Sequence, residues 1–288
     1  MRSIAILAYT ARPAAVTWAA YAIERLLQEG VEISVEAALA EQLPSTLAQR
    51  CEVRSTLEVA KRADMVMSFG GDGTILAASH TFMEMDIPIM GVNVGKLGFL
   101  AEFPVTELDA AIMDVVKGNY RIVDRTTLCV EHNGATSVAL NEVLIERATE
   151  AKMIAVRAFV NDHHVADYRA DGVIVCTPTG STAYSLAAGG PILAPSASVL
   201  CITPIAPHTL TIRPLIVEDT SEIRFELLGD ASPCHVVADG QILGTVDSST
   251  TVVIRKSEHL VKLVKRAEST YYDLLREKLL WSADPTQR

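Results

Sequence analysis

Residues 65–74 read Met65-Val66-Met67-Ser68-Phe69-Gly70-Gly71-Asp72-Gly73-Thr74, an apolar run that leads directly into three glycines around one aspartate. Apolar residues on both faces, bounded by glycines, are typical of a strand buried between helix layers in a parallel sheet. A helical pattern follows from Thr74 to Met83. The stretch therefore predicts a strand, a turn and a helix, with Asp72 at the carboxyl end of the strand. In open α/β sheets this edge is where ligands bind.

The glycine-rich turn predicts a site that handles phosphate. Glycine has no Cβ, so the turn can adopt positive φ angles and a phosphate can approach the bare backbone. The free N–H groups and the positive dipole end of the following helix attract anions. A tight turn with a capping aspartate is the simpler interpretation. Three glycines, a central carboxylate and the flanking elements together favour the phosphate site.

The composition narrows the class of protein. A chain of 288 residues suffices for one large or two ordinary domains, and its net charge of −10 comes without a block of like charges. Nucleic-acid binding needs a basic surface, so we expect no nucleic-acid partner. No apolar run approaches the roughly 20 residues that span a bilayer, and the first residues lack the pattern of a signal peptide. We expect a soluble, cytoplasmic protein with no membrane partner. Five scattered cysteines predict reduced thiols rather than disulfides or a zinc site.

The hydrophobic pattern predicts two domains and a returning helix. Residues 1–103 alternate strand and helix patterns, which indicates an α/β domain with a Rossmann-like parallel sheet. Residues 104–267 contain mainly short strand patterns separated by turn residues, typical of an all-β, sandwich-like domain. Residues 268–288 contain an amphipathic helix with a Thr-x-x-Asp start at Thr270 and Asp273. Its apolar stripe must be buried somewhere, and we expect it to pack back on the first domain.

Polar residues interrupt the strand patterns of the second domain at three places. Asn141 and Glu142 lie inside an apolar run, where burial without partners would cost on the order of several kcal/mol in total. They indicate either a ligand site or a strand end that faces solvent. Arg169 and Asp171 are consistent with a surface ion pair of little energetic consequence. The sequence Ala238-Asp239-Gly240-Gln241 alone predicts an ordinary hairpin turn.

The turn that follows residues 173–176 is rich in hydroxyl groups. Hydroxyls and free amides on a rigid turn suit the sugar and phosphates of a nucleotide, and the ring of Tyr184 offers a surface on which a base can stack. The hydroxyl-bearing residues are Thr177, Thr179, Ser181 and Thr182.

Taken together, these segments resemble the NAD kinase family. The resemblance covers residues 4–281 and rests on five motifs: GGDGT at 70–74, GVNVGKLGFL at 91–100, the Asn-Glu pair at 141–142, DGVIVCTPTGSTAYSLAAGGPI at 171–192, and ADGQ at 238–241. GGDGT alone is weak, because lipid kinases share it and phosphofructokinases have a close relative. The segment from Thr177 to Ile192 is far more specific.

The resemblance implies an activity and a set of ligands. Members transfer the γ-phosphoryl group of ATP to the 2′-hydroxyl of the adenosine ribose of NAD, which makes NADP. It also implies a phosphofructokinase-like first domain, Mg²⁺ or another divalent metal held mainly by substrate phosphates, and a homodimer or homotetramer built through the β domains. The chain lacks a Walker A lysine motif, so backbone amides and the metal must neutralise the phosphate charge.

The resemblance also implies residue roles. Asp72 matches the general base, and a carboxylate in hydrogen-bond reach of a ribose hydroxyl typically accelerates transfer by about 10²–10⁴-fold. The remaining matches are nucleotide-binding positions: Gly73, Asn141, Glu142, Lys152, Arg169, Asp171, Thr182, Ala183, Tyr184, Ser185, Leu186, Ala187 and Gln241.

Two other functions stay open at this point. A lipid kinase of the diacylglycerol type would share GGDGT, but it should have an apolar substrate cleft rather than a hydroxyl-rich turn. A non-catalytic dinucleotide-binding regulator would bind NAD without consuming ATP and would not need Asp72. The residues leave open whether the donor is ATP, another triphosphate or polyphosphate, and whether NADH is accepted.

Overall fold

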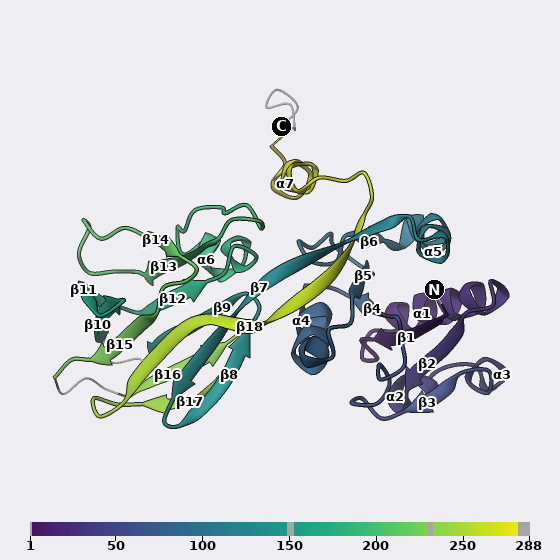
Figure 1. Cartoon of the computed structure of the whole chain (residues 1–288), viewed down its shortest axis with the longest axis horizontal. Coiled ribbons are helices and arrows are strands. Elements are labelled where there is room, and N and C mark those ends of the chain that lie inside the picture. The colour runs from purple at the N-terminus through teal and green to yellow at the C-terminus, as the bar shows by residue number, and fades with distance from the viewer. Residues whose placement is uncertain (1, 149–152, 230–232, 282–288) are drawn as a thin grey trace. The chain divides into compact units, whose positions relative to one another are not determined.

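The computed structural model describes residues 2–148, 153–229 and 233–281. The chain forms two compact units, whose elements are labelled in Figure 1. Unit 1 contains residues 1–124 and 261–288, and unit 2 contains residues 125–260.

Unit 1 is built on a parallel sheet with the strand order β3-β2-β1-β4-β5. The chain leaves β1 towards β2 on one side, and β4 lies on the other side of β1. The carboxyl ends of β1 and β4 therefore flank a topological switch point, the place where open α/β sheets bind ligands. The strands are β1 (Ser3–Ala8), β2 (Glu32–Glu36), β3 (Glu52–Arg54), β4 (Met65–Gly70), β5 (Ile89–Asn93) and β6 (Phe103–Pro104), which pairs with β5.

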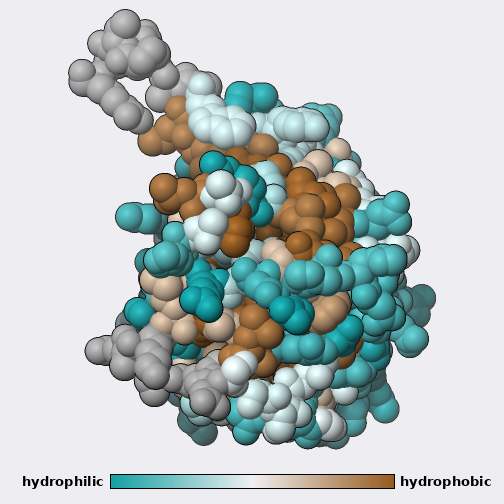
Figure 2. All heavy atoms as spheres, turned by 90° about the vertical axis from the view of Figure 1, so that its left-hand side faces the viewer, coloured by the Kyte–Doolittle hydropathy of each residue, from teal (hydrophilic) through white to brown (hydrophobic). Residues whose placement is uncertain are grey.

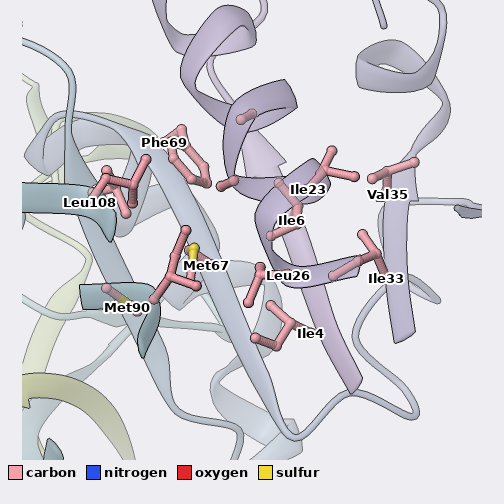
Figure 3. Packing of buried hydrophobic residues seen from close by; sticks show 14 of the residues in the cluster. Ile4, Ile6, Ile23, Leu26, Ile33, Val35, Met67, Phe69, Met90 and Leu108 are labelled. Atoms are coloured by element: carbon pink, nitrogen blue, oxygen red, sulfur yellow. The ribbon is translucent and has the colours of Figure 1, made fainter. Parts of the chain in front are cut away.

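Helices cover this sheet and bury its apolar residues. Ile23 and Leu26 of α1 lie against Ile4 and Ile6 of β1 and Met67 of β4, as Figure 3 shows. The helices of unit 1 are α1 (Pro13–Gln28), α2 (Ala37–Ala40), α3 (Ser45–Ala48), α4 (Asp72–Phe82), α5 (Leu108–Lys117) and α7 (Tyr271–Leu279), with 3₁₀ turns at Met83–Met85 and Val105–Glu107.

Helix α5 lies in unit 1, although the change of sequence pattern after residue 103 placed it in the β-rich domain. Its apolar face, with Leu108, Ile112 and Val115, is buried in the core that α1 and the sheet share. Asp109 accepts hydrogen bonds from Tyr21 and Arg25 of α1 at 2.7 and 3.1 Å. The hydrophobic period shows that a helix has a face to bury, but not which neighbour will cover it.

The C-terminal helix returns to the first unit, as expected. Thr270 and Asp273 form the expected capping box, and Leu274 and Leu275 of α7 are buried. Lys278 donates a hydrogen bond to the carbonyl oxygen of Leu97. The helix is thereby tied to the loop that follows β5.

Unit 2 is a pair of antiparallel sheets with a shared apolar core. One has the order β14-β13-β12-β9-β16-β17; in the other, β10 lies between β11 and β15, β15 pairs with β18, and β7 pairs with β18 and β8. The last residues of β18 belong to unit 1, where Leu263 pairs with Ile89 of β5. The elements are β7 (Tyr120–His132), β8 (Ala135–Ala139), β9 (Glu142–Arg147), β10 (Ile154–Val160), β11 (His163–Ala170), β12 (Gly172–Cys176), a 3₁₀ turn (Gly180–Thr182), α6 (Tyr184–Ala187), β13 (Val199–Ile205), β14 (Leu215–Glu218), β15 (Ile223–Leu227), β16 (Cys234–Ala238), β17 (Gln241–Val246) and β18 (Thr251–Arg266).

The alternation of buried and exposed residues along these strands explains the sandwich. Val143 and Ile145 of β9, Val156 of β10 and Phe225 of β15 all point into the same fully buried cluster. The predicted fold, an α/β domain followed by a β sandwich, is confirmed. All five cysteines are free thiols. Within the described ranges, no helix combines the length and the apolarity that a membrane crossing requires.

Candidate active site

The carboxylate of Asp72 is held by the backbone of a distant loop. Asp72 is the first residue of α4, directly after β4. Its Oδ2 accepts the N–H of Phe99 at 2.8 Å, and its Oδ1 accepts the N–H groups of Leu100 and Ala101, both at 3.0 Å. A carboxylate has about four lone-pair positions, so one position remains for another proton donor. Asp72 therefore has a fixed orientation and one position left to accept a further hydrogen bond.

Close packing explains Gly70 and Gly98, whereas Gly71 and Gly73 face open space. None of Gly70, Gly71 and Gly73 has a positive φ, so the sequence argument from positive φ is wrong for this turn. A Cβ at Gly98 would lie 1.8 Å from Oδ1 of Asp72, so only glycine allows the loop to reach that carboxylate. At Gly71 and Gly73 a Cβ would meet no atom within 4 Å. Their bare backbone instead faces open space that a ligand can use.

That open space belongs to a pocket of about 580 Å³ at the switch point of the unit 1 sheet. Gly71, Gly73 and Thr74 form one wall, at the N-terminus of α4, and Tyr9 and Arg12 come from the loop after β1. Arg12 has no carboxylate partner in the part of the chain that the structure describes. The ring of Tyr9 is 57% exposed, which leaves it available for stacking. A phosphate group here would meet a guanidinium and the positive end of a helix.

A second pocket in unit 1, of about 670 Å³, has the opposite charge. It lies among α5, α7 and the loop that follows β5. Its lining contains one arginine, Arg266, and the acidic residues Glu102, Glu107, Asp114, Glu268, Asp273 and Glu277. Coulomb repulsion from these carboxylates disfavours a triphosphate. Of the two pockets, the one at the switch point is suited to a nucleotide.

In unit 2, Asn141 and Glu142 lie at the start of β9, and a second aspartate holds their backbone. Asp239 accepts the N–H of Leu140 at 2.7 Å, of Asn141 at 2.8 Å and of Glu142 at 3.1 Å. The side chain of Asn141 is only 9% exposed. Oε2 of Glu142 is buried without a hydrogen-bond partner in the described protein. The solvent-facing strand end considered from the sequence is therefore wrong for these two residues.

The environment of Glu142 makes its ionisation unfavourable. Burial is the main cause and the nearby negative charge of Asp239 the second, while a hydrogen bond from the N–H of Tyr184 acts in the opposite direction. Together they raise the pKa of Glu142 to about 7. The carboxyl group thus changes charge near neutral pH, unlike an exposed glutamate.

The hydroxyl groups of the turn after β12 hold the turn itself. Thr177 donates to the carbonyl oxygen of Leu140 at 2.6 Å and accepts the N–H of Gly180 at 3.1 Å. The hydroxyl of Ser185 is fully buried and 2.9 Å from that of Thr203. A Cβ at Gly180 would lie 2.0 Å from the carbonyl oxygen of Asn141. The turn is thus packed directly against the Asn-Glu pair, and its hydroxyl groups hold the turn in that place.

The structure brings several further predicted residues to this cluster. Thr182 and Ala183 are half-buried before α6, and within α6 Leu186 is half-buried while Ala187 is exposed. The ring of Tyr184 is 43% exposed, so it can contact a ligand. Gln241 begins β17 and is exposed, beside the Asp239 turn.

Other predicted residues lie elsewhere. Glu142 is opposite Cys176 on β12, whereas Gly172 is opposite Glu146. Asp171 and Arg169 therefore lie beyond the far end of β12, roughly 13 Å along the strand. Asp171 pairs with Arg147 at 3.0 Å, so the Arg169–Asp171 pair considered as one interpretation of the sequence is wrong. Lys152 lies outside the described residues.

Comparisons with known proteins identify the family of the chain. The family model of the ATP-NAD kinase N-terminal domain matches residues 4–120, and that of the ATP-NAD kinase C-terminal domain matches residues 140–266. An NAD kinase of Geobacter sp. (strain M21) is 39% identical, with 98% of this chain and 99% of the relative covered. The chain belongs to the NAD kinase family.

Another relative and two solved structures are also similar to this chain. An NAD kinase of Methanothermobacter thermautotrophicus is 40% identical over 88% of each chain. An NAD kinase of Archaeoglobus fulgidus, solved in complex with ATP, has a TM-score of 0.75 and 26% identity, and covers 97% of this chain and 99% of its own. The yeast NADH kinase, solved with NADH, has the same fold, with a TM-score of 0.90 over 99% of this chain and 89% of its own at 24% identity.

Family membership confirms the predicted function, a kinase that phosphorylates NAD to NADP. It decides against the two alternatives, the lipid kinase and the non-catalytic regulator. The sequence argument missed Arg12, and it gave Gly98, Thr177 and Asp239 no role of their own although they lie in the motifs that it quoted. Arg12 is an ordinary polar residue in a loop, with no local signal of a role. Thr177 was visible in the hydroxyl-rich turn, but not its contacts with Leu140 and Gly180. The Asp239 turn was visible, but not the partners of its carboxylate.

Proposed function

We propose that the enzyme transfers the γ-phosphoryl group of ATP to the 2′-hydroxyl of the adenosine ribose of NAD, with Asp72 as general base. The observation that carries this proposal is the carboxylate of Asp72, which three backbone amides orient at the carboxyl edge of a parallel sheet. A ribose hydroxyl is a poor nucleophile until its proton is accepted. A carboxylate that is already oriented needs no rearrangement at the moment of transfer.

The donor nucleotide binds in the 580 Å³ pocket at the switch point. Its phosphates lie against Gly71, Gly73 and the N-terminus of α4, and Arg12 supplies positive charge. Tyr9 provides a ring for the base. The pocket supports this assignment because its lining combines bare backbone, an exposed aromatic ring and a guanidinium that has no carboxylate partner among the described residues.

The acceptor NAD is bound by the cluster of unit 2. Asn141 is buried, and Glu142, which accepts the N–H of Tyr184, has a buried Oε2 without a partner among the described residues. A buried polar atom without a partner favours a ligand that completes its hydrogen bonds. The half-exposed ring of Tyr184 suits stacking on a base. Thr182, Ala183, Leu186, Ala187 and Gln241 form the surrounding wall. Ser185 stays a prediction, as do Arg169, Asp171 and Lys152 for the ribose and nicotinamide ends.

Magnesium fits the donor pocket only together with the nucleotide. The described residues contain no group of three or more His, Cys, Asp or Glu side chains arranged around a metal. Mg²⁺ commonly binds through one or two carboxylates plus substrate phosphates, and Glu36 is a carboxylate in the pocket lining. Bound there, the ion would neutralise charge on the transferring phosphates.

We also propose self-association through the β-rich unit. Leu210 is 86% exposed, Ile242 64% and Ile216 46%, which is unfavourable for large apolar side chains in water. Figure 2 shows hydrophobic residues reaching the surface among hydrophilic ones on one face of the molecule. Analytical ultracentrifugation distinguishes a dimer or tetramer from a monomer. Cytoplasmic location stays a prediction.

Incubation with NAD, ATP and Mg²⁺, followed by mass spectrometry, tests the activity. The expected product is one phosphate heavier than NAD and carries that phosphate on the 2′-hydroxyl. GTP and polyphosphate in place of ATP identify the donor, and NADH in place of NAD tests the acceptor.

The Asp72→Asn variant tests the base. Asparagine keeps an oxygen for the loop amides but accepts a proton poorly, so kcat should fall by about 10²–10⁴-fold with NAD binding retained. The matched control is Asp64→Asn, because Asp64 also accepts two backbone amides of unit 1, those of Arg2 and Ser3, at 2.6 and 3.2 Å. Wild-type kcat in a folded Asp72→Asn protein would refute the assignment.

A further inference from the structure

The turn between β16 and β17 does more than reverse the chain. Asp239 and Gly240 have φ angles of 47° and 80°, as a two-residue hairpin turn requires. An asparagine would satisfy the same turn, since Asn-Gly is at least as favourable there as Asp-Gly. The turn alone therefore does not explain the carboxylate.

The carboxylate of Asp239 has a different use, which is to hold three consecutive backbone amides. It accepts the N–H groups of Leu140, Asn141 and Glu142 at 2.7, 2.8 and 3.1 Å. The N–H of Asp239 in turn donates to the carbonyl oxygen of Glu142 at 3.1 Å. Residues separated by nearly a hundred positions are thus locked together, in the same way that Asp72 holds residues 99–101.

This arrangement places two acidic groups close together. The negative charge of Asp239 disfavours ionisation of the buried Glu142 and contributes to its raised pKa. Glu142 is faced by Asp239 from the β16–β17 turn, by Cys176 from β12 and by the N–H of Tyr184 from α6. A purely structural link could use a neutral side chain and avoid this repulsion. The carboxylate is therefore better explained by the residues that it positions.

We propose that Asp239 is a positioning residue of the acceptor site, which fixes the backbone of Asn141 and Glu142 so that their side chains are presented to NAD. The inference rests on the acceptor role proposed above for Asn141 and Glu142. Asp239 does not touch the reacting atoms; it acts through the two residues whose amides it holds.

The Asp239→Asn variant tests this role, because it preserves the turn and one acceptor oxygen but removes the charge. Calorimetric titration with NAD over a pH series around neutrality should give a dissociation constant about tenfold higher than that of the wild type, as expected when charge-assisted hydrogen bonds are weakened. The pH dependence of NAD affinity should also shift to lower pH, because the charge that disfavours ionisation of Glu142 is gone. A merely structural role would lower the melting temperature without moving that pH profile.

Two controls make the result specific. Asp64→Asn loses a comparable carboxylate-to-amide contact in unit 1 and should leave the NAD dissociation constant and its pH profile unchanged. In Glu142→Gln the pH dependence of the NAD dissociation constant should disappear. Adding Asp239→Asn to that variant should then produce no further effect on this pH dependence.

Hydrogen exchange on the wild type provides a test that does not depend on the variant folding. The amides of Leu140, Asn141 and Glu142 should be protected in the absence of NAD, and rapid exchange at all three would overturn the proposal. Unchanged NAD affinity and an unchanged pH profile in a folded Asp239→Asn protein would overturn it as well. If the wild type phosphorylates NAD while Asp239→Asn binds it normally, only this inference fails. A wild type that binds no NAD overturns the proposed acceptor site and, with it, this inference.

Discussion

Replacing Glu142 with glutamine should make the free enzyme more stable at neutral and alkaline pH. The pKa of Glu142 is raised to about 7 from an ordinary value of 4.5, because burial and Asp239 disfavour the charged form. A group whose folded-state pKa is raised contributes its full stability below the unfolded-state pKa and loses it as the pH rises through the folded-state pKa. The wild type should therefore lose stability progressively between about pH 4.5 and pH 7.

The size of the effect follows from the same two values. A rise of the pKa from 4.5 to about 7 corresponds to roughly 3 kcal/mol in the free energy of unfolding once the group is ionised. Glutamine has nearly the same volume and does not ionise. The difference between the variant and the wild type should thus be small near pH 4.5 and approach roughly 3 kcal/mol above pH 8.

Urea unfolding at a series of pH values measures this difference. Circular dichroism of the β structure should report it for unit 2. Both tryptophans, Trp18 and Trp281, belong to unit 1, so their fluorescence provides an internal control. Glu258→Gln, at an exposed position of β18, should change stability by less than about 0.5 kcal/mol at every pH. A stability difference for Glu142→Gln that stays constant from pH 4.5 to 8 would refute the reasoning.

Two further substitutions test unit 1. Arg12→Ala should raise the KM for ATP about tenfold and leave the KM for NAD unchanged, because it removes the guanidinium of the donor pocket. The control variant, Arg62→Ala at an exposed position, should change neither KM. Equal effects of Arg12→Ala on the two KM values would contradict the assignment. Lys265→Ala should lower the free energy of unfolding by about 3 kcal/mol, measured by tryptophan fluorescence, because Lys265 is 2% exposed and pairs with Glu102. Lys61→Ala, in an exposed ion pair, should cost less than about 1 kcal/mol, and a similar loss in both variants would show that burial is not the cause.

The sequence by itself determined the local structure of the protein, the strands, turns and helix caps that depend on residues close together in the chain. The apolar run at 65–69 and the glycines after it predicted β4, the turn and the position of Asp72 at the edge of the sheet, all of which the structure contains. The Thr270–Asp273 capping box and the Asp239-Gly240 turn were visible for the same reason. Local backbone preferences and hydrophobic period depend on residues only a few positions apart.

Only the tertiary structure decided which partners the polar side chains would have. Asp72 bonds to amides 27 to 29 residues away, and Asp239 to amides 97 to 99 residues away. Ser185 binds Thr203 inside the protein, although its sequence context suggested a ligand contact. A sequence pattern shows that a buried polar group needs a partner, because burial without one is costly, but the pairing of strands far apart in the chain determines which partner it finds.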